Sequence, residues 1–222
     1  MTIKDSAKTI LCYGDSNTWG NVPRSDKRYP RSVRWPSVLQ KLLGEDYEVI
    51  SEGLCGRTFV AMDGAKQHRT GISYLQVLLE SHDPIDLIVI MLGTNDIKTT
   101  YNLTAEEVAQ DLEETIFSIK NPKLELEKIP RTLIICPPPV IQPSVNPRSK
   151  EGQELDEGMA RGIELFKSLP SLFKEVAKRH QCYFLNAGDY VSSSTVDGYH
   201  LDKKSHLKLA EVVKNEVLKM KI

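Results

Sequence analysis

Hydrophobic residues along the chain gather in short runs that contain no regular alternation with polar positions. These runs are "TILCY" (9–13), "YEVIS" (47–51), "DLIVIML" (86–92), "TLIIC" (132–136) and "CYFLN" (182–186). A continuous apolar run of this length is typical of a strand that is buried on both faces, as in a parallel sheet. The pattern therefore predicts one buried strand at each run.

The segments between and after these runs place apolar residues three and four positions apart, which is the spacing of one helix face. They cover residues 35–44, 71–82, 104–120, 162–180 and 202–220. Helices that alternate with buried strands imply parallel βαβ units joined by right-handed crossovers. We therefore expect an α/β fold in which helices cover both faces of the sheet, as a three-layer α/β/α sandwich.

The composition fits one domain without a strong charge. The 222 residues, 40% of them hydrophobic, suffice for one well-buried α/β domain, which we expect to span residues 1–222. A formal net charge of −1 provides no long-range field for nucleic acid, an anionic membrane or a polyanionic substrate. No apolar run approaches the roughly 20 residues that span a bilayer, and the first residues lack a secretory signal pattern. We therefore expect a soluble, cytoplasmic protein.

The cysteines and most of the histidines show no pattern of a redox or metal site. The cysteines lack CxxC spacing and lie mostly in or beside apolar runs, so we interpret them as buried free thiols. They are Cys12, Cys55, Cys136 and Cys182. Four histidines fall in polar loops or at helix ends and have no catalytic company. They are His68, His82, His180 and His206.

Two segments rich in proline and charge follow predicted strands, at residues 20–34 and 137–158. Both are long for loops of an α/β protein, and long ordered loops are often functional. The arginines and lysine of the first segment favour a solvated or inter-subunit surface over an anion site. The second segment is expected to reach the edge of the substrate crevice, where it would shape access or a subunit contact.

Small polar residues follow three of the predicted strands, at the edge where open α/β sheets bind their ligands. Ser16 follows the first strand in "ILCYGDSNTWG", Gly53 and Gly56 follow the second in "EGLCGRT", and Asn95 follows the third in "LGTND". The carboxyl ends of parallel strands meet at one sheet edge, so we expect these residues to converge. A hydroxyl beside hydrogen-bond donors suits acyl transfer, because the hydroxyl attacks the carbonyl and the donors hold the resulting oxyanion.

A base for this hydroxyl is available far downstream, in "VDGYHLD" before the last predicted helix. Asp197 and His200 lie three residues apart there. This spacing allows the carboxylate to accept the Nδ1 proton of the imidazole, which leaves Nε2 free to accept a proton from Ser16.

Each of these residues also has a simpler structural interpretation when taken alone. Ser16 or Asp15 alone is typical of a helix N-cap, and Gly56 alone of a backbone with positive φ. Asn95 alone suits a turn after a strand, and His200 alone a surface turn. The features occur together in the order that the topology requires, and this coincidence favours the catalytic interpretation.

Four short blocks carry a resemblance to a known family. "GDSN" at 14–17, Gly56 in "EGLCGRT", "GTND" at 93–96 and "DGYH" at 197–200 resemble the sequence blocks of the SGNH hydrolases, also called the GDSL-type esterase/lipase family. The match spans residues 8 to about 215, and phrases such as "VRWPSVL" and "IMLGTND" bring the chain close to the intracellular arylesterase and acyltransferase branch. Asn17 departs from the motif, because the family's name has leucine there.

The resemblance implies a flavodoxin-like fold with a five-stranded parallel sheet, for which we expect the strand order 2-1-3-4-5. It also implies Ser16 as nucleophile, with Asp197 and His200 completing a catalytic triad. The implied oxyanion hole consists of the backbone N–H groups of Ser16 and Gly56 and the side-chain amide of Asn95. The departure at position 17 flanks the nucleophile and is expected to carry no chemistry.

The predicted activity is hydrolysis of small carboxylic esters through an acyl-enzyme, with water or another alcohol releasing the acyl group. We expect a small-molecule ester as partner and no metal or organic cofactor, and we leave open whether the chain forms a homo-oligomer. Trp19, close behind the nucleophile, is expected either in a wall of the substrate pocket or in the core. One alternative is a carbohydrate O-deacetylase with the same active site. Another is a non-catalytic flavodoxin-like binding module, which the lack of a glycine-rich phosphate loop disfavours.

Overall fold

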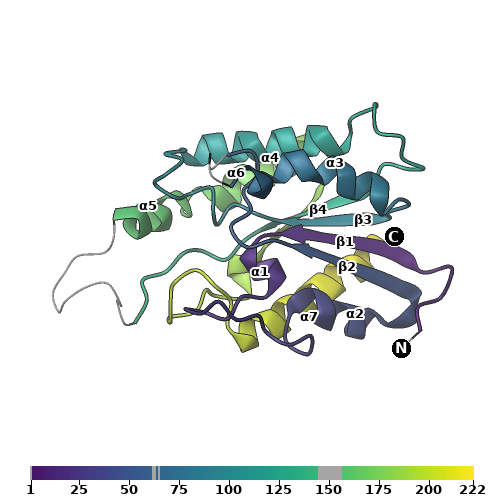
Figure 1. Cartoon of the computed structure of the whole chain (residues 1–222), viewed down its shortest axis with the longest axis horizontal. Coiled ribbons are helices and arrows are strands. Elements are labelled where there is room, and N and C mark those ends of the chain that lie inside the picture. The colour runs from purple at the N-terminus through teal and green to yellow at the C-terminus, as the bar shows by residue number, and fades with distance from the viewer. Residues whose placement is uncertain (1, 62–63, 65, 145–156) are drawn as a thin grey trace.

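The computed structural model describes residues 2–61, 64, 66–144 and 157–222, and it contains one parallel sheet with helices on both faces (Figure 1). The strands are β1 (Lys8–Gly14), β2 (Tyr47–Gly53), β3 (Leu87–Met91), β4 (Arg131–Cys136) and β5 (Tyr183–Asn186). Their order in the sheet is β2-β1-β3-β4-β5, and every neighbouring pair is parallel. The predicted strands, fold class and strand order are thus confirmed.

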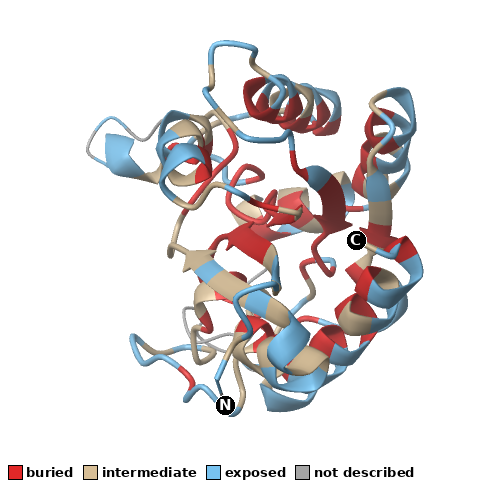
Figure 2. Cartoon of the chain, turned by 90° about the vertical axis from the view of Figure 1, so that its right-hand side faces the viewer, coloured by how far each residue is buried: buried red, intermediate tan, exposed pale blue. Residues whose placement is uncertain are grey.

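Burial differs between the centre and the edges of this sheet. All five residues of β3 are buried, whereas β2 has only partly buried and exposed residues. The prediction of strands buried on both faces is therefore correct for the central β1, β3 and β4 but wrong for β2 and β5. These two lie at the edges of the sheet, where the helices of each layer cover them less completely (Figure 2).

Two hydrophobic cores lie on the two faces of the sheet, and successive residues of β1 point alternately into them. Leu11 and Tyr13 belong to the core beneath α3 (Gly71–Ser81), α4 (Ala105–Ile119) and α6 (Leu169–Arg179). Ile10 and Cys12 belong to the core between the opposite face of the sheet and the helices α2 (Trp35–Leu43) and α7 (Lys203–Met220). Figure 1 shows the first group of helices above the sheet and the second group below it, which is the expected three-layer arrangement.

The remaining helices are short, and one predicted helical segment is divided. The segment 162–180 forms the end of α5 (Glu157–Leu165) and the whole of α6, with a break between them. Pro170 lies in the first turn of α6, where its lack of an N–H is harmless and where it prevents one continuous helix. The other short elements are α1 (Ser16–Trp19) and the 3₁₀ turns Gly44–Asp46, Gln67–Arg69 and Ala187–Asp189.

Two glycines allow α1 to lie directly against the carboxyl ends of β1 and β2. A Cβ atom at Gly14 would lie 2.1 Å from Thr18 Oγ1, and one at Gly53 would lie 2.2 Å from the backbone nitrogen of Trp19. Any larger residue would displace α1, and with it Ser16.

No helix in the described part of the chain is both long and apolar enough to cross a membrane.

The second proline-rich segment begins beside the turn that contains Asp197. The backbone N–H of Ile141 donates to the carbonyl oxygen of Gly198 at 3.1 Å, and Gly158 lines the cavity described below. Residues 145–156 of this segment lie outside the described residues, so the expected role of the full loop stays a prediction.

Candidate active site

Ser16 is the first residue of α1 and follows the end of β1 directly. Asp15, not Ser16, caps this helix, because its carboxylate accepts the backbone N–H of Asn17 at 2.8 Å. The Ser16 hydroxyl is therefore available for another partner. Only 7% of Ser16 is exposed, and this residue lies at the carboxyl edge of the sheet, as predicted.

The hydroxyl of Ser16 meets a histidine that lies 184 positions later in the sequence. Ser16 Oγ is 3.0 Å from His200 Nε2, and His200 Nδ1 is 2.7 Å from Asp197 Oδ2. The other carboxylate oxygen of Asp197 accepts the backbone N–H groups of Tyr199 at 3.1 Å and His200 at 3.0 Å. These bonds close a tight turn around Gly198, whose φ of 80° is in the left-handed region that glycine adopts easily.

Asp197 is held in its ionised form by its hydrogen bonds. Burial alone would raise the pKa of this carboxyl, but the hydrogen bonds from His200 and Tyr199 lower the pKa to about 2. The backbone N–H of Arg24 adds a further hydrogen bond, at 2.9 Å from Oδ2. The segment 20–34, interpreted from its charge as a solvated or inter-subunit surface, thus also supports the Asp197 carboxylate.

Asn17 connects the helix that starts at Ser16 to the residues on both sides of His200. Its amide nitrogen donates to the carbonyl oxygen of Tyr199 at 3.2 Å, and its amide oxygen accepts the N–H of Leu201 at 2.9 Å. The side chain is almost fully buried, with 1% exposed. The position that departs from the leucine of the family motif therefore has a structural function that the sequence did not reveal.

Gly56 and Asn95 lie at the ends of β2 and β3, beside Ser16. Gly56 has a φ of 81°, and its N–H has no acceptor in the described part of the chain. The amide nitrogen of Asn95 donates to the carbonyl oxygen of Arg57 at 3.0 Å and lies 3.4 Å from Asp15 Oδ2. The second contact is long for a hydrogen bond, so this N–H is the one that a stronger acceptor would capture.

A buried arginine joins the ends of two strands beneath the site. The guanidinium of Arg57 donates to the carbonyl oxygens of Gly14, at 2.9 Å, and Glu52. Its Cζ also lies 4.1 Å from the ring centroid of Tyr13, a cation–π contact. Because Gly14 precedes Ser16 by two residues, Arg57 fixes the strand end from which the serine projects.

Two buried carboxyl groups lie close to the site. Burial raises the pKa of Asp15 to about 6, against the lowering effect of its hydrogen bond with Asn17. Burial likewise raises the pKa of Asp96 to about 7, although one of its oxygens accepts the N–H of Phe59 at 2.8 Å. The other oxygen of Asp96 has no hydrogen-bond partner among the described residues, which fits a carboxyl that is partly protonated near neutral pH.

A cavity of about 690 Å³ opens over the serine. Ser16, Gly56, Asn95 and His200 all line it, so the structure brings together the residues that the sequence selected. Trp19 does not line this cavity in the described structure, and it is only partly buried, so its expected place in a substrate wall or in the core stays a prediction. Its ring is instead covered by the guanidinium of a neighbouring arginine, at 4.9 Å.

Comparison with known proteins decides the family. The family model for GDSL-like lipases and acylhydrolases matches residues 12–208 of the chain. The chain belongs to this GDSL-like family. Membership, together with its esterase relatives, makes the chain a carboxylic ester hydrolase, as predicted, and replaces the alternative of a non-catalytic binding module.

Several relatives of this GDSL-family chain have known structures or activities. A carbohydrate acetylesterase from Sinorhizobium meliloti is 32% identical, covers 96% of this chain and 99% of its own, and superposes with a TM-score of 0.86. An aryl esterase from M. smegmatis is 33% identical with the same coverage and a TM-score of 0.85. An acetylxylan esterase from Xylanibacter ruminicola is 26% identical over 230 residues, which are 95% of this chain but only 43% of that protein.

Three other histidines of this GDSL-family chain lie away from the cavity and make contacts that stabilise the fold. His82 contacts Glu52 at 3.2 Å, and His180 contacts Glu113 at 2.6 Å. His206 was expected in a polar loop or at a helix end but is fully buried in α7, and this burial lowers the pKa of its imidazole to about 4. The described residues contain no group of three or more histidine, cysteine or acidic side chains that could hold a metal ion.

The cysteines are all free, as predicted, but they are not all buried. Cys12 and Cys136 are buried, whereas Cys55 and Cys182 are partly exposed. Cys55 lines the cavity next to Gly56. Its position in the turn after β2, in a run of residues that the family motif already marks, was the signal that could have placed it there.

Proposed function

We propose that the chain hydrolyses small carboxylic esters with Ser16 as nucleophile, His200 as base and Asp197 as the group that orients the base. The observation that carries the proposal is the unbroken series of hydrogen bonds, 3.0 Å from Ser16 Oγ to His200 Nε2 and 2.7 Å from His200 Nδ1 to Asp197 Oδ2. Side chains of these types at these distances activate a serine hydroxyl for acyl transfer.

The reaction proceeds in two halves. His200 accepts the proton of Ser16 while the serine oxygen attacks the ester carbonyl, and the ionised Asp197 stabilises the imidazolium. His200 then donates this proton to the leaving alcohol, which leaves an acyl-enzyme on Ser16. Water attacks the acyl-enzyme with His200 again as base, and the acid departs. An alcohol in place of water gives a new ester.

The negative oxygen of each tetrahedral intermediate is held by the N–H groups of Ser16 and Gly56 and by the amide of Asn95. The N–H of Gly56, without an acceptor in the described chain, supports this role. Asn95 takes part by exchanging its 3.4 Å contact with Asp15 for the substrate oxygen. Donors that are already positioned act without reorganisation, so each contributes about 2.7–4 kcal/mol to transition-state stabilisation.

The relatives favour acetyl esters of carbohydrates as a second candidate substrate class. One solved relative is a carbohydrate acetylesterase and one sequence relative is an acetylxylan esterase, whereas another solved relative is an aryl esterase. The proposed chemistry is the same for both classes. The ratio of kcat/KM for an acetylated xylo-oligosaccharide and for p-nitrophenyl acetate discriminates between them.

The test of the proposed nucleophile compares two serines that line the same cavity, Ser16 and Ser25. Ser16→Ala should abolish p-nitrophenyl acetate hydrolysis and covalent labelling by an organophosphonate, whereas Ser25→Ala should retain both. Mass spectrometry of the labelled peptide identifies the modified serine, and circular dichroism checks that both variants fold. Full labelling of a folded Ser16→Ala variant would contradict the proposal.

A further inference from the structure

Two cationic side chains that form no salt bridge within the described part of the chain face the proposed reaction site. Arg69, at the end of the 3₁₀ turn Gln67–Arg69, and Lys98, three residues after Asn95, both line the cavity that contains Ser16. Neither forms a salt bridge or a side-chain hydrogen bond within the described part of the chain. Lys98 lies at the exposed rim of the cavity, whereas Arg69 is only partly exposed.

Arg69 packs directly against Gly56. A Cβ atom at Gly56 would lie 2.6 Å from Nη1 and 3.2 Å from Cζ of the guanidinium. The backbone of Arg69 is fixed, because its N–H donates to Lys66 at 2.9 Å and its carbonyl oxygen accepts from Thr58 at 3.2 Å. The guanidinium is thus positioned beside Gly56, a proposed oxyanion donor, and so close to where the substrate carbonyl would lie.

The guanidinium of Arg69 also has an unsatisfied polar group. Its Nε is buried and has no hydrogen-bond partner among the described residues. Buried polar groups in proteins are nearly always paired, and an unpaired one is costly. A ligand with a planar anionic group would supply the missing acceptor, since an arginine binds a carboxylate through two parallel hydrogen bonds.

The carboxylates around the cavity do not neutralise these cations. Asp197 is engaged by His200 and by the N–H of Arg24, and Asp26 is exposed on the first proline-rich segment. Asp15 and Asp96, both buried, attract Lys98 electrostatically but form no ion pair with it. The lining of the cavity carries three cationic side chains, Arg24, Arg69 and Lys98, against the two carboxylates Asp26 and Asp197, although the whole chain has a formal net charge of −1.

We propose that the ester substrate carries a free carboxylate, which Arg69 and Lys98 hold while the ester carbonyl lies between Ser16 and Gly56. This inference rests on the proposed function of Ser16. The cavity of about 690 Å³ has room for an aromatic or sugar ester with such a group. A single local anion differs from a polyanion, which the weak overall charge still disfavours.

The experiment compares pairs of esters that differ in one charge. For a carboxylate in the alcohol half, the pair is 4-acetoxybenzoate and its methyl ester. For a carboxylate in the acyl half, the pair is monophenyl adipate and methyl phenyl adipate. The measured quantity is the ratio of kcat/KM between the anionic and the neutral member, in the wild type and in each variant.

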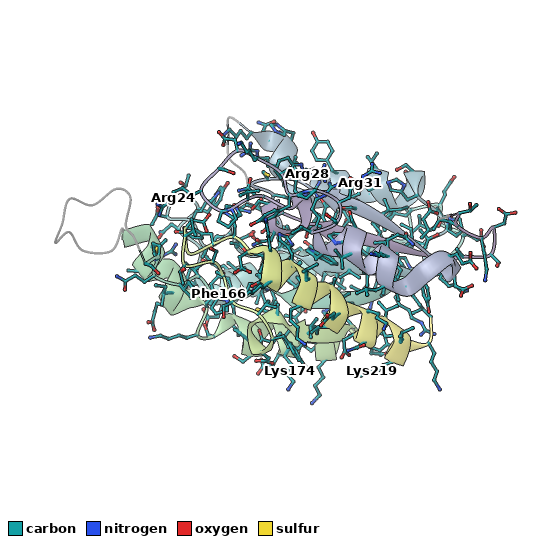
Figure 3. The ribbon with its side chains drawn as sticks, turned by 90° about the horizontal axis from the view of Figure 1, so that it is seen from below. Arg24, Arg28, Arg31, Phe166, Lys174 and Lys219 are labelled. Carbon is teal, nitrogen blue, oxygen red and sulfur yellow. The ribbon has the colours of Figure 1, made fainter. Side chains whose placement is uncertain are left out.

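Arg69→Gln should lower this ratio by about 10- to 100-fold for one of the two pairs, as expected for loss of a charged hydrogen-bonded contact. Lys98→Gln should lower it less, because Lys98 lies at the exposed rim. The matched control is Arg31→Gln, which removes the same charge from an exposed arginine that does not line the cavity and should leave the ratio unchanged (Figure 3).

An unchanged ratio in Arg69→Gln would overturn the proposal. If kcat/KM fell equally for both members of a pair, so that the ratio stayed the same, Arg69 would be assigned to stabilising the oxyanion and not to binding a carboxylate. A measurement on the wild type guards against a variant that fails to fold. Benzoate should inhibit at least tenfold more strongly than benzamide, and equal inhibition would contradict the proposal. If the wild type hydrolysed neither member of either pair, or if Ser16→Ala hydrolysed both members of a pair, the proposed function itself would be wrong.

Discussion

Asn17 should be required to hold His200 in position, although it does not line the cavity. Its side chain forms hydrogen bonds with the carbonyl oxygen of Tyr199, at 3.2 Å, and with the N–H of Leu201, at 2.9 Å, the residues on both sides of His200. Asn17→Ala removes both bonds, and Asn17→Leu removes them while keeping a similar volume and introducing the residue of the family motif. In both variants, two backbone groups close to His200 lose their partners.

The two lost bonds set the magnitude of the effect. Each buried group left without a partner costs about 1–3 kcal/mol, so the free energy of unfolding should fall by about 2–6 kcal/mol at most. Water that enters the gap would reduce this cost. A misplacement of His200 by about 1 Å would lower kcat by about 100-fold, because proton transfer from Ser16 depends on the 3.0 Å distance between Oγ and Nε2.

The assay separates a positioning function from a purely structural one. We expect kcat for p-nitrophenyl acetate to fall about 10- to 100-fold with little change in KM, since Asn17 does not contact the cavity. The downfield proton NMR signal of His200 Nδ1–H, which reports its bond to Asp197, should broaden. The matched control is Asn186→Ala, which removes an asparagine that likewise makes two side-chain hydrogen bonds and does not line the cavity, but whose partners are Gly188 and Asp189 and not the residues beside His200.

The reasoning would be refuted by a variant that melts at a lower temperature but keeps kcat within twofold of the wild type. Such a result would mean that Asn17 stabilises the fold without positioning His200. Retained activity in Asn17→Leu with loss in Asn17→Ala would show that filling the space is sufficient and that the two hydrogen bonds are not needed.

Asn95→Ala should lower kcat by about 10²–10³, because it removes one oxyanion donor. Asn95→Asp should also lower the melting temperature, because its carboxylate would face Asp15 at 3.4 Å and the carbonyl oxygen of Arg57 at 3.0 Å. A fully active, stable Asp variant would contradict this prediction. Asp197→Asn should lower kcat by about 10⁴ in a folded protein, because the amide would favour the wrong tautomer of His200. Burial lowers the pKa of His206 from 6.5 to about 4, so the unfolded chain binds more protons than the folded chain between these pH values. The free energy of unfolding should therefore fall by about 3 kcal/mol as the pH drops from 6.5 to 4. Urea titrations at a series of pH values should show this contribution to the pH dependence in the wild type and its loss in His206→Phe.

Local sequence patterns were sufficient to predict the strands, most of the helices and the edge at which the chemistry lies. A buried strand needs a run of apolar residues and a helix face needs its periodic spacing, so both leave a signal within about ten residues. Ser16 and Asn95 were predicted at the same edge because parallel strands place their carboxyl ends together. The order of the strands then explains why β2 and β5, with similar apolar runs, are less buried than β3.

The contacts that support the site were decided only by the tertiary structure. The bonds of Asn17 to Leu201 and of Arg24 to Asp197 span 184 and 173 positions, and no local pattern can encode a partner at that distance. The packing of Arg69 on Gly56 and the full burial of His206 depend in the same way on which elements meet. The sequence by itself therefore determined which residue types reach the sheet edge, while the folded chain decided which polar groups they contact, because each such contact is fixed by packing between distant segments.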